Sequence, residues 1–246
     1  MKVSVVSRVY NEWYLINEFL DYYREIVTKD GGKFYFYDDG STDGTLEILQ
    51  KDPDCVVVAG TRESGVMSHN NQRPQRRMMM DMACKDLGEN DYILLLDIDE
   101  FLTFSQPIEA ITQDLVYLDL FDFYITEEDK DLHWSKREYV GPERRHIAFM
   151  VRKGAYKTVV ADRTLVTTGG PVLHEGGFVK HMGKAVSIEY WENKCSHYAS
   201  PGMPEKYRGK WEARKGKAIH TVSDFNTPLY KWDDIITKKD LWITIG

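Results

Sequence analysis

Two aspartates, Asp97 and Asp99, follow an apolar run at residues 93–96 and form the sharpest chemical signal in the sequence. In an extended chain, residues two apart point to the same side, so both carboxylates can converge on one site at a strand end. Two like charges held together repel unless a cation lies beside them. Carboxylate oxygens favour Mg²⁺ or Mn²⁺, which would bridge to a diphosphate and stabilise the charge of a departing nucleoside diphosphate. The alternative is a polar strand end whose acids cap the next turn.

A second acidic segment, DDGSTDGT, occupies residues 38–45. The segment resembles the start of a twelve-residue calcium-binding loop, but that loop needs a bidentate Glu at its twelfth position, where this sequence has Gln50. As a strand-to-helix turn it is consistent, because Thr42 or Asp43 can cap the helix while Asp39 faces the crevice. A carboxylate in that place can accept a hydrogen bond from a nucleobase N–H or a ribose hydroxyl.

The first hundred residues alternate between strand and helix patterns. Strands are expected at 3–6, 34–37, 55–59 and 92–96, and helices at 13–23, 42–50 and 72–87. Asn11 is expected to cap the first helix. This order predicts an α/β fold with an open, mostly parallel sheet flanked by helices. Ligands bind beyond the carboxyl ends of the strands in such sheets, and three of these ends carry polar clusters, at 7–8, 38–39 and 97–99.

The second half of the chain has a less regular pattern. A helix is expected at 108–117, and strands are expected at 121–125 and 148–152. Loops are indicated around His174 by the glycines on either side of it. The C-terminal part is therefore predicted to be less regular than the first hundred residues.

Three segments within residues 1–104 occur in a characteristic order: VSVVSRVYNE, FYFYDDGSTDGT and YILLLDIDEFL. Together they resemble the nucleotide-sugar glycosyltransferases of the GT-A (Rossmann-like) fold, family-2-like, and NEWYLINEFLDYY with LLLDIDEFL looks closest to the family-92-like subgroup. The resemblance is good to about residue 104 and thin afterwards. It implies a nucleotide-sugar-binding half at 1–104, an acceptor-binding and metal-completing half of the same domain at 105–220, and a C-terminal extension at 221–246.

The resemblance also implies which residues bind the donor, a nucleoside-diphosphate sugar that is expected to be UDP-linked. In this family the loop after the first strand contacts the nucleoside, and that loop here contains Ser7, Arg8 and Val9. The second acid of the DD pair, Asp39, would bind the base or ribose. In this family a basic residue also contacts the nucleotide from the helix that precedes the strand ending in the D-x-D motif, here Asp97-Ile98-Asp99. Arg76 is the first candidate for that residue and Arg73 the second.

A divalent metal, Mn²⁺ or Mg²⁺, is implied by the same resemblance. The first acid of D-x-D, Asp97, would meet the ribose or the metal, and the second, Asp99, would bind the metal directly. Many members of the family take a third ligand from a His late in the core. His197 is the first choice for that ligand here, and His174 also resembles a His of the subgroup.

An inverting transferase needs a carboxylate or His within reach of the acceptor hydroxyl, and inversion is expected from the resemblance alone. The candidates for this catalytic group are Glu127, Glu128, Asp129, His174 and Glu175. The usual base of family-2 enzymes lies much further along the sequence from D-x-D than Glu127 does. This position counts against the acidic cluster at 127–129. A retaining enzyme would need no such base.

Composition restricts the partners. The chain has 246 residues and a formal charge of -7, which argues against a general nucleic-acid or anionic-membrane binder. Its three cysteines form no C-x-x-C pair, which argues against a disulfide framework. No apolar run is long enough for a signal peptide or a membrane span, so a cytoplasmic location is expected. The expected acceptor is a glycan or glycoconjugate. A tethering partner, or a larger polypeptide to which this chain belongs, could bring the enzyme to it.

Three other functions compete with this interpretation. A nucleotidyltransferase usually has a G-x-G-T-R loop after the first strand, and SRVYNE contains no glycine. An Asp-dependent phosphotransferase or hydrolase expects Thr or Val where Phe101 stands. The third is a nucleotide-sugar-binding protein without turnover, and the presence of Asp39, Asp97 and Asp99 argues against such a loss of activity.

Overall fold

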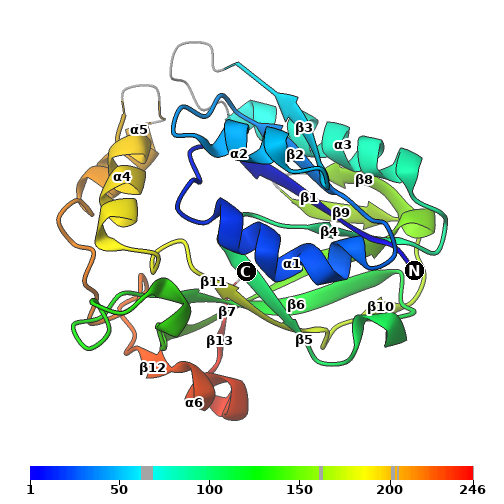
Figure 1. The fold of residues 1–246 in the computed structure, drawn as a ribbon. Coiled ribbons are helices and arrows are strands. Elements are labelled where there is room, and N and C mark those ends of the chain that lie inside the picture. Colours follow the sequence, from blue (N-terminus) through cyan, green and yellow to red (C-terminus); the bar gives the residue numbers. More distant parts are fainter. Residues whose placement is uncertain (62–68, 161–162, 201–202, 204, 246) are drawn as a thin grey trace. The chain divides into compact units, whose positions relative to one another are not determined.

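The computed structural model describes residues 1–61, 69–160, 163–200, 203 and 205–245 (Figure 1). The chain forms two compact units, each assembled from separate stretches of sequence. Unit 1 consists of Met1–Asp99, Thr103–Leu118 and Ile147–Gly177, and unit 2 consists of Glu100–Leu102, Asp119–His146 and Phe178–Gly246. Four strands, β5 (Glu100–Phe104), β6 (Leu115–Phe123), β7 (Tyr139–Arg152) and β11 (Gly177–His181), contribute residues to both units.

Unit 1 alternates strands and helices along its first hundred residues. The strands are β1 (Val3–Val9), β2 (Phe34–Asp38), β3 (Cys55–Ala59) and β4 (Tyr92–Leu95), and the helices between them are α1 (Ile16–Thr28), α2 (Thr45–Lys51) and α3 (His69–Asp86). The unit is completed by the antiparallel pair β8 (Tyr156–Val160) and β9 (Thr164–Thr167), the short β10 (Val172–Leu173), and the single turns η1 (Ile108–Ala110) and η3 (Lys153–Ala155).

The strands of unit 1 lie in the order β3-β2-β1-β4-β7. The first four pair in parallel, and β7 runs antiparallel to β4. The chain moves from β1 outward to β2 and β3 and then returns to the other side of β1. Right-handed crossovers with that order place α1 and α2 on one face of the sheet and α3 on the other. The expected α/β fold with an open, mostly parallel sheet flanked by helices is confirmed.

Alternating side chains of β2 show how the two faces are covered. Phe36 faces α1, where its ring lies 6.3 Å from that of Phe19. Tyr35 lies on the opposite face of the sheet, in a hydrophobic cluster that includes Met79, Met80 and Ala83 of α3. The Tyr35 hydroxyl also donates a hydrogen bond to Asp86 of α3. Both faces are thus buried, which explains the nearly continuous apolar runs in these strands.

Unit 2 is built on the remaining parts of β6 and β7. Here β11 pairs in parallel with β6, and the short strands β12 (Tyr230–Lys231) and β13 (Ile243–Thr244) pair with β7. The helices are α4 (Ile188–Tyr198), α5 (Glu205–Glu212) and α6 (Trp232–Thr237), with the single turns η2 (Trp134–Lys136) and η4 (Lys239–Leu241). Aromatic rings fill its core, including Phe121 against Trp232 and Trp242. Among the described residues, none of the helices has the length and apolar character needed to cross a bilayer.

Two local expectations are wrong. The segment expected as a helix at 108–117 contains only the turn η1, and β6 begins at Leu115. The apolar residues of 115–123 are needed in the sheet, and this tertiary pairing overrides the helical spacing. Asn11 does not cap α1, which begins at Ile16 without a side-chain cap. Asn11 adopts a left-handed φ of 53° and accepts a hydrogen bond from the Thr42 N–H instead.

The close approach of α1 and β1 at Gly32 generates the first prediction. A Cβ at this position would lie 2.0 Å from the Val3 carbonyl oxygen and 2.7 Å from the Val27 carbonyl oxygen. Because both contacts are with backbone, Gly32→Ala should reduce the free energy of unfolding by about 3 kcal/mol, measured by urea denaturation. Gly209→Ala is the matched control, since its Cβ would enter open space on α5 and should be neutral or add up to about 1 kcal/mol. Equal stability of both variants would contradict the packing described here.

Candidate active site

Three parallel strands of unit 1 end at the same edge of the sheet. Val9, the last residue of β1, pairs with Asp38, the last residue of β2. On the other side of β1, the Leu96 N–H just after β4 donates to the Val6 carbonyl. Parallel pairing therefore gathers Arg8, the acidic turn after β2 and the D-x-D segment at one edge, which is where ligands bind in open α/β sheets.

The loops after β1 and β2 are locked together by hydrogen bonds. The Asn11 N–H donates to the Ser41 hydroxyl at 2.9 Å, and the Thr42 N–H returns a bond to the Asn11 side chain at 2.9 Å. Asp38 accepts bonds from the N–H groups of residues 40 and 41. Asp43 accepts a bond from the Thr45 N–H at the start of α2. The segment is thus a strand-to-helix turn, as expected, and it holds the intervening Asp39 in place.

Asp39 lies in a small polar cluster with residues from β1 and α3. Its Oδ2 atom accepts a hydrogen bond from Arg8, and its Oδ1 atom accepts one from the Gln75 amide at 3.2 Å. Arg8 also donates to Gln75 at 2.6 Å, which closes the cluster. Only 9% of the Arg8 side chain and 11% of the Asp39 side chain are exposed. The structure thus brings together Arg8 and Asp39, while Ser7 and Val9 beside them are buried.

Asp97 lies between two guanidinium groups. Arg76 of α3 donates to Oδ1 at 2.8 Å, and Arg163 donates to Oδ2 at 3.3 Å. Loss of solvent around Asp97 raises its pKa, and the negative charge of Asp99 raises it further. The charges of the two arginines outweigh both and hold the pKa below its ordinary value. Asp97 therefore stays ionised, although 35% of its side chain remains exposed to solvent.

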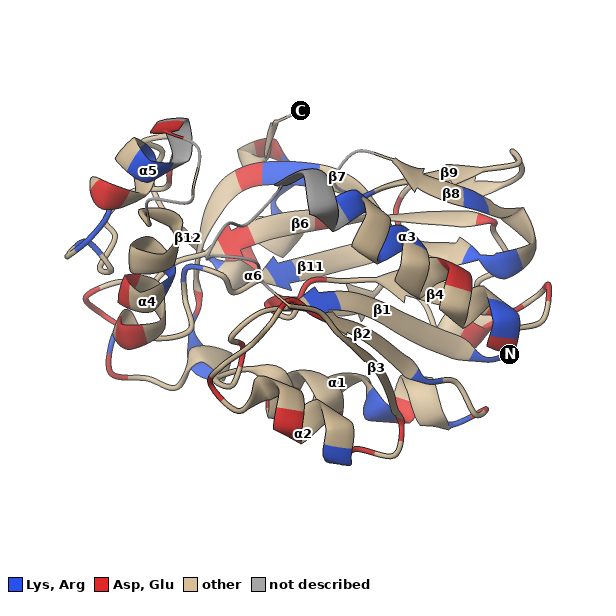
Figure 2. Cartoon of the chain, turned by 90° about the horizontal axis from the view of Figure 1, so that it is seen from above, with Lys and Arg blue, Asp and Glu red and all other residues tan. Residues whose placement is uncertain are grey.

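Arg163 was not predicted from the sequence. It stands 66 residues after Asp97, just before β9, in a segment without any motif. The guanidinium also donates to the Leu95 carbonyl at 2.9 Å and lies 4.7 Å from the centre of the Phe149 ring. Only the folding of β8 and β9 brings this residue to the end of β4, so no local signal could have identified it. By contrast, Arg73 on α3 is exposed, and basic residues occur along this helix (Figure 2).

Asp97 and Asp99 are a suitable pair for a divalent metal. Both supply hard carboxylate oxygens, and the charge of Asp99 is close enough to act on Asp97. Mg²⁺ is commonly bound by one or two carboxylates, with water and substrate phosphates completing its shell. In the described part of the chain, no three His, Cys, Asp or Glu side chains gather into a metal site. The two carboxylates fit a divalent metal by their chemistry, and a third protein ligand stays a prediction.

The two histidines of the sequence prediction have aromatic neighbours. His197 lies on α4 in unit 2, with its ring 5.1 Å from Tyr198. His174 is exposed in unit 1 and stacks on Tyr117 at 5.3 Å. These contacts orient both rings without assigning either to a metal, so the roles of His197 and His174 stay predictions.

The acidic candidates for the catalytic base have different environments. Asp129 is buried and accepts hydrogen bonds from Thr126 and Arg137, contacts typical of a structural carboxylate. Glu127 is exposed and pairs with Lys130 on the same turn. Glu175 is exposed, and its backbone carbonyl accepts a bond from Ser105. The structure leaves the assignment of a base among these residues as a prediction.

No family model matches this chain, and no curated protein matches it. Several solved structures resemble it at low sequence identity. TarS residues 1–349 of S. aureus is 15% identical with a TM-score of 0.40, covering 86% of this chain and 69% of that one. The mannosyltransferase PcManGT from Pyrobaculum calidifontis, in complex with GDP-Man and Mn²⁺, is 16% identical with a TM-score of 0.43, covering 87% and 68%.

A third structure, glucosyl-3-phosphoglycerate synthase from Mycobacterium tuberculosis in complex with Mn²⁺, UDP and glucosyl-3-phosphoglycerate, is 19% identical. Its TM-score is 0.31, and the match covers 54% of this chain and 47% of that one. At these TM-scores the likeness supports no conclusion about function. The family-92-like likeness stays a prediction.

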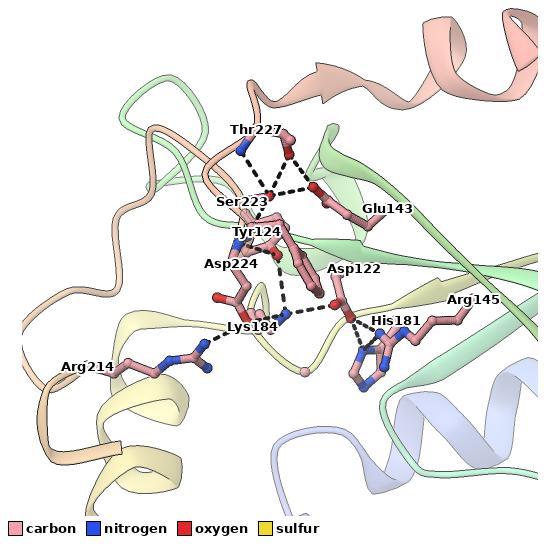
Figure 3. Close-up of polar contacts among 12 residues, drawn as sticks. Asp122, Tyr124, Glu143, Arg145, His181, Lys184, Arg214, Ser223, Asp224 and Thr227 are labelled. Carbon is pink, nitrogen blue, oxygen red and sulfur yellow. Dashed lines mark hydrogen bonds and ion pairs between the residues drawn. The ribbon is translucent and has the colours of Figure 1, made fainter. Parts of the chain in front are cut away.

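A second group of charged residues lies in unit 2 (Figure 3). Lys184, with 12% of its side chain exposed, bonds to Asp122 at 2.8 Å and pairs with Asp224 at 3.0 Å. Arg214 pairs with the same oxygen of Asp224 at 2.7 Å. The Tyr124 hydroxyl accepts bonds from Lys184 and from the Asp224 N–H. The network joins β6, the segment after β11, and the loops around residues 214 and 224.

Asp122 is the centre of this network. Besides Lys184 it contacts His181 and Arg145. Burial alone would raise the pKa of Asp122, but the charges of Lys184, His181 and Arg145 outweigh it and hold the pKa well below its ordinary value. No motif marks this group in the sequence, because FDFY has the alternating pattern of an ordinary half-buried strand.

The depressed pKa of Asp122 makes stability depend on pH. Its contribution is present above the ordinary value of 3.8 and is lost as pH falls below it, because the unfolded chain then binds the proton more readily. Asp122→Asn should cost about 3 kcal/mol at neutral pH, since it removes one partner of a buried pair. We expect the difference from the unaltered chain to shrink as urea unfolding is repeated from about pH 5 towards pH 3.

Asp21→Asn is the control for loss of one negative charge. Its side chain is 79% exposed, and the change should stay within about 0.5 kcal/mol of the unaltered chain at neutral pH. A difference between Asp122→Asn and the unaltered chain that stays constant at every pH would contradict the ionised, paired state of Asp122.

Proposed function

We propose that this chain is a GT-A-like glycosyltransferase that moves a sugar from a nucleoside-diphosphate sugar, with UDP as the expected nucleotide, to a hydroxyl group of a glycan or glycoconjugate. The observation that carries the proposal is that Asp39 and Asp97, each paired with arginine, both lie at the carboxyl ends of parallel strands in unit 1. Carboxylates there suit a nucleoside and a metal, and guanidinium groups suit phosphate oxygens.

The Arg8, Asp39 and Gln75 cluster would bind the nucleoside. A carboxylate has about four acceptor sites, so Asp39 can accept hydrogen bonds from a base or ribose as well as those from Arg8 and Gln75. Arg8 and Gln75 hold the carboxylate in one orientation before the ligand arrives. This preorganisation lowers the entropy lost on binding.

Asp99 and Asp97 would hold Mn²⁺ or Mg²⁺, together with oxygens of the donor diphosphate. When bound, this metal would stabilise the negative charge of the departing nucleoside diphosphate. Arg76, which is 5% exposed and lies beside Asp97, would stabilise the negative charge of the same departing diphosphate. Placing these charges before reaction avoids the cost of reorganising them in the transition state.

Inversion at the transferred sugar is part of the proposal and requires a base near the acceptor. Of the predicted candidates, the exposed carboxylates are Glu127, Glu128 and Glu175, whereas Asp129 is buried and paired with Arg137. An aspartyl phosphotransferase is less favoured, because both oxygens of Asp97 are bonded to guanidinium groups, which weakens a carboxylate as a nucleophile.

Loss of Asp99 tests the metal-dependent reaction. Asp99→Asn keeps the size of a side chain that is 6% exposed but removes a charge, and should reduce transfer at least about 100-fold. The measurement is release of the nucleoside diphosphate from sugar donors in the presence of glycan acceptors and Mn²⁺. Asp30→Asn, on an exposed loop, is the charge control. Near-normal turnover by Asp99→Asn would remove the proposed metal role, and donor binding without release in the unaltered chain would indicate a binding protein.

Loss of Asp39 tests the nucleoside site. Asp39→Ala should weaken nucleotide binding about 10-fold, because it removes a charged acceptor, while the rate at saturating donor changes little. Thermal shifts with UDP, GDP, CDP and TDP, each with and without Mn²⁺, measure the binding, since a ligand of the folded state raises the melting temperature. A fall in the saturated rate with unchanged binding would place Asp39 outside the nucleoside site.

A further inference from the structure

Arg163 and Asp97 form a contact that the proposed function does not by itself require. Both oxygens of Asp97 are engaged by arginines, Oδ1 by Arg76 and Oδ2 by Arg163. A metal bound to Asp97 would have to share these oxygens with two cations or replace one of them. The carboxylate is 35% exposed, whereas the Arg76 side chain is only 6% exposed and the Arg163 side chain 15%. Of the three groups, the carboxylate is therefore the most accessible to a ligand from solvent.

Arg163 is fixed by contacts that do not involve Asp97. Its second terminal nitrogen donates to the Leu95 carbonyl at 2.9 Å, and its guanidinium carbon lies 4.7 Å from the centre of the Phe149 ring. The group would thus keep its place if Asp97 turned away. A guanidinium offers five N–H donors in a planar fork, which suits two oxygens of a phosphate as well as those of a carboxylate.

Arg76 has donors that remain unused. Its Nε and NH1 atoms are buried and have no hydrogen-bond partner among the described residues. Unsatisfied donors on a buried charged group are costly, and a phosphate oxygen is one of the acceptors that could satisfy them. The site thus contains two guanidinium groups that can bind an anion and a carboxylate that can bind a cation.

We propose that Arg163 is a diphosphate-binding residue that holds Asp97 while the donor is absent, and that the two exchange partners when metal and diphosphate bind together. This inference rests on the proposed function. A metal alone would leave Arg163 without its carboxylate and close to a dication. A diphosphate alone would meet the charges of Asp97 and Asp99. Bound together, each charged group has an opposite partner, so metal and diphosphate favour each other's binding.

The test measures the two ligands separately. Mn²⁺ binding without nucleotide is followed by electron paramagnetic resonance, and UDP binding at saturating Mn²⁺ is followed by calorimetry, with GDP as a second probe. In Arg163→Gln, Mn²⁺ alone should bind about 10-fold more tightly, because a competing cation has been removed. UDP with Mn²⁺ should bind about 10-fold more weakly, because a charged donor has been lost. These opposite changes are the signature of an exchange.

Two further variants separate charge from packing. Arg163→Lys keeps the positive charge but loses the fork, so Mn²⁺ alone should bind as in the unaltered chain while UDP binds more weakly. If Arg163→Gln fails to fold, as judged by circular dichroism, Arg163→Lys still tests the UDP arm. Arg77→Gln is the matched control, since Arg77 lies next to Arg76 on α3 with a side chain that is 61% exposed, and it should change neither affinity.

The outcomes distinguish the inference from the function on which it rests. Unchanged affinities in folded Arg163→Gln, or a parallel weakening of both ligands, would overturn the exchange and leave Arg163 as a structural residue. Tighter Mn²⁺ binding by Arg163→Lys would also overturn it, because the charge would then not be the cause. If the unaltered chain binds neither UDP nor GDP with Mn²⁺, the proposed function itself fails, whatever the Mn²⁺ arm shows.

Discussion

Acidic side chains gathered at the ends of parallel strands repel one another, and the candidate site depends on the cations that balance them. Asp39 is balanced by Arg8, and Asp97 by Arg76 and Arg163. Without these arginines the charge of Asp99 would act on Asp97 with little to oppose it, and the carboxylate would take up a proton more readily. The two arginines thus keep Asp97 ionised although it is partly buried, which is the state that a metal ligand needs.

A single helix supplies partners to two strand ends. Gln75 of α3 bonds to Asp39, and the next residue, Arg76, bonds to Asp97. Consecutive residues on a helix point in directions about 100° apart, so neighbouring side chains can serve different strands. The position of α3 is set by the apolar residues that follow, Met79, Met80 and Ala83, which are buried against the sheet. Packing in the core of unit 1 thus fixes the polar contacts at its edge.

The sequence predicts local elements better than the contacts between them. The strand expected at 55–59 has the same bounds in β3, and the alternation of strands and helices in the first hundred residues is confirmed. The helix expected at 108–117 is wrong because pairing in the sheet decided the structure of that segment. The motifs select Asp39 and Asp97 as candidates, and the structure pairs both with arginine, while their roles stay predictions. Arg163 had no motif, since its contact with Asp97 depends on the folding of β8 and β9.

The charged network of unit 2 is difficult to explain by stability alone. Replacing a buried ion pair with apolar residues is often neutral or even stabilising, so Lys184 between Asp122 and Asp224 needs another reason. Its contacts suggest one, because the network joins segments with little regular structure, including the loops that carry Arg214 and Asp224. Apolar side chains in such loops could pack in several ways, whereas paired charges are satisfied in few arrangements. Through these paired charges the loops of Arg214 and Asp224 are connected to Asp122 of β6, Arg145 of β7 and His181 of β11.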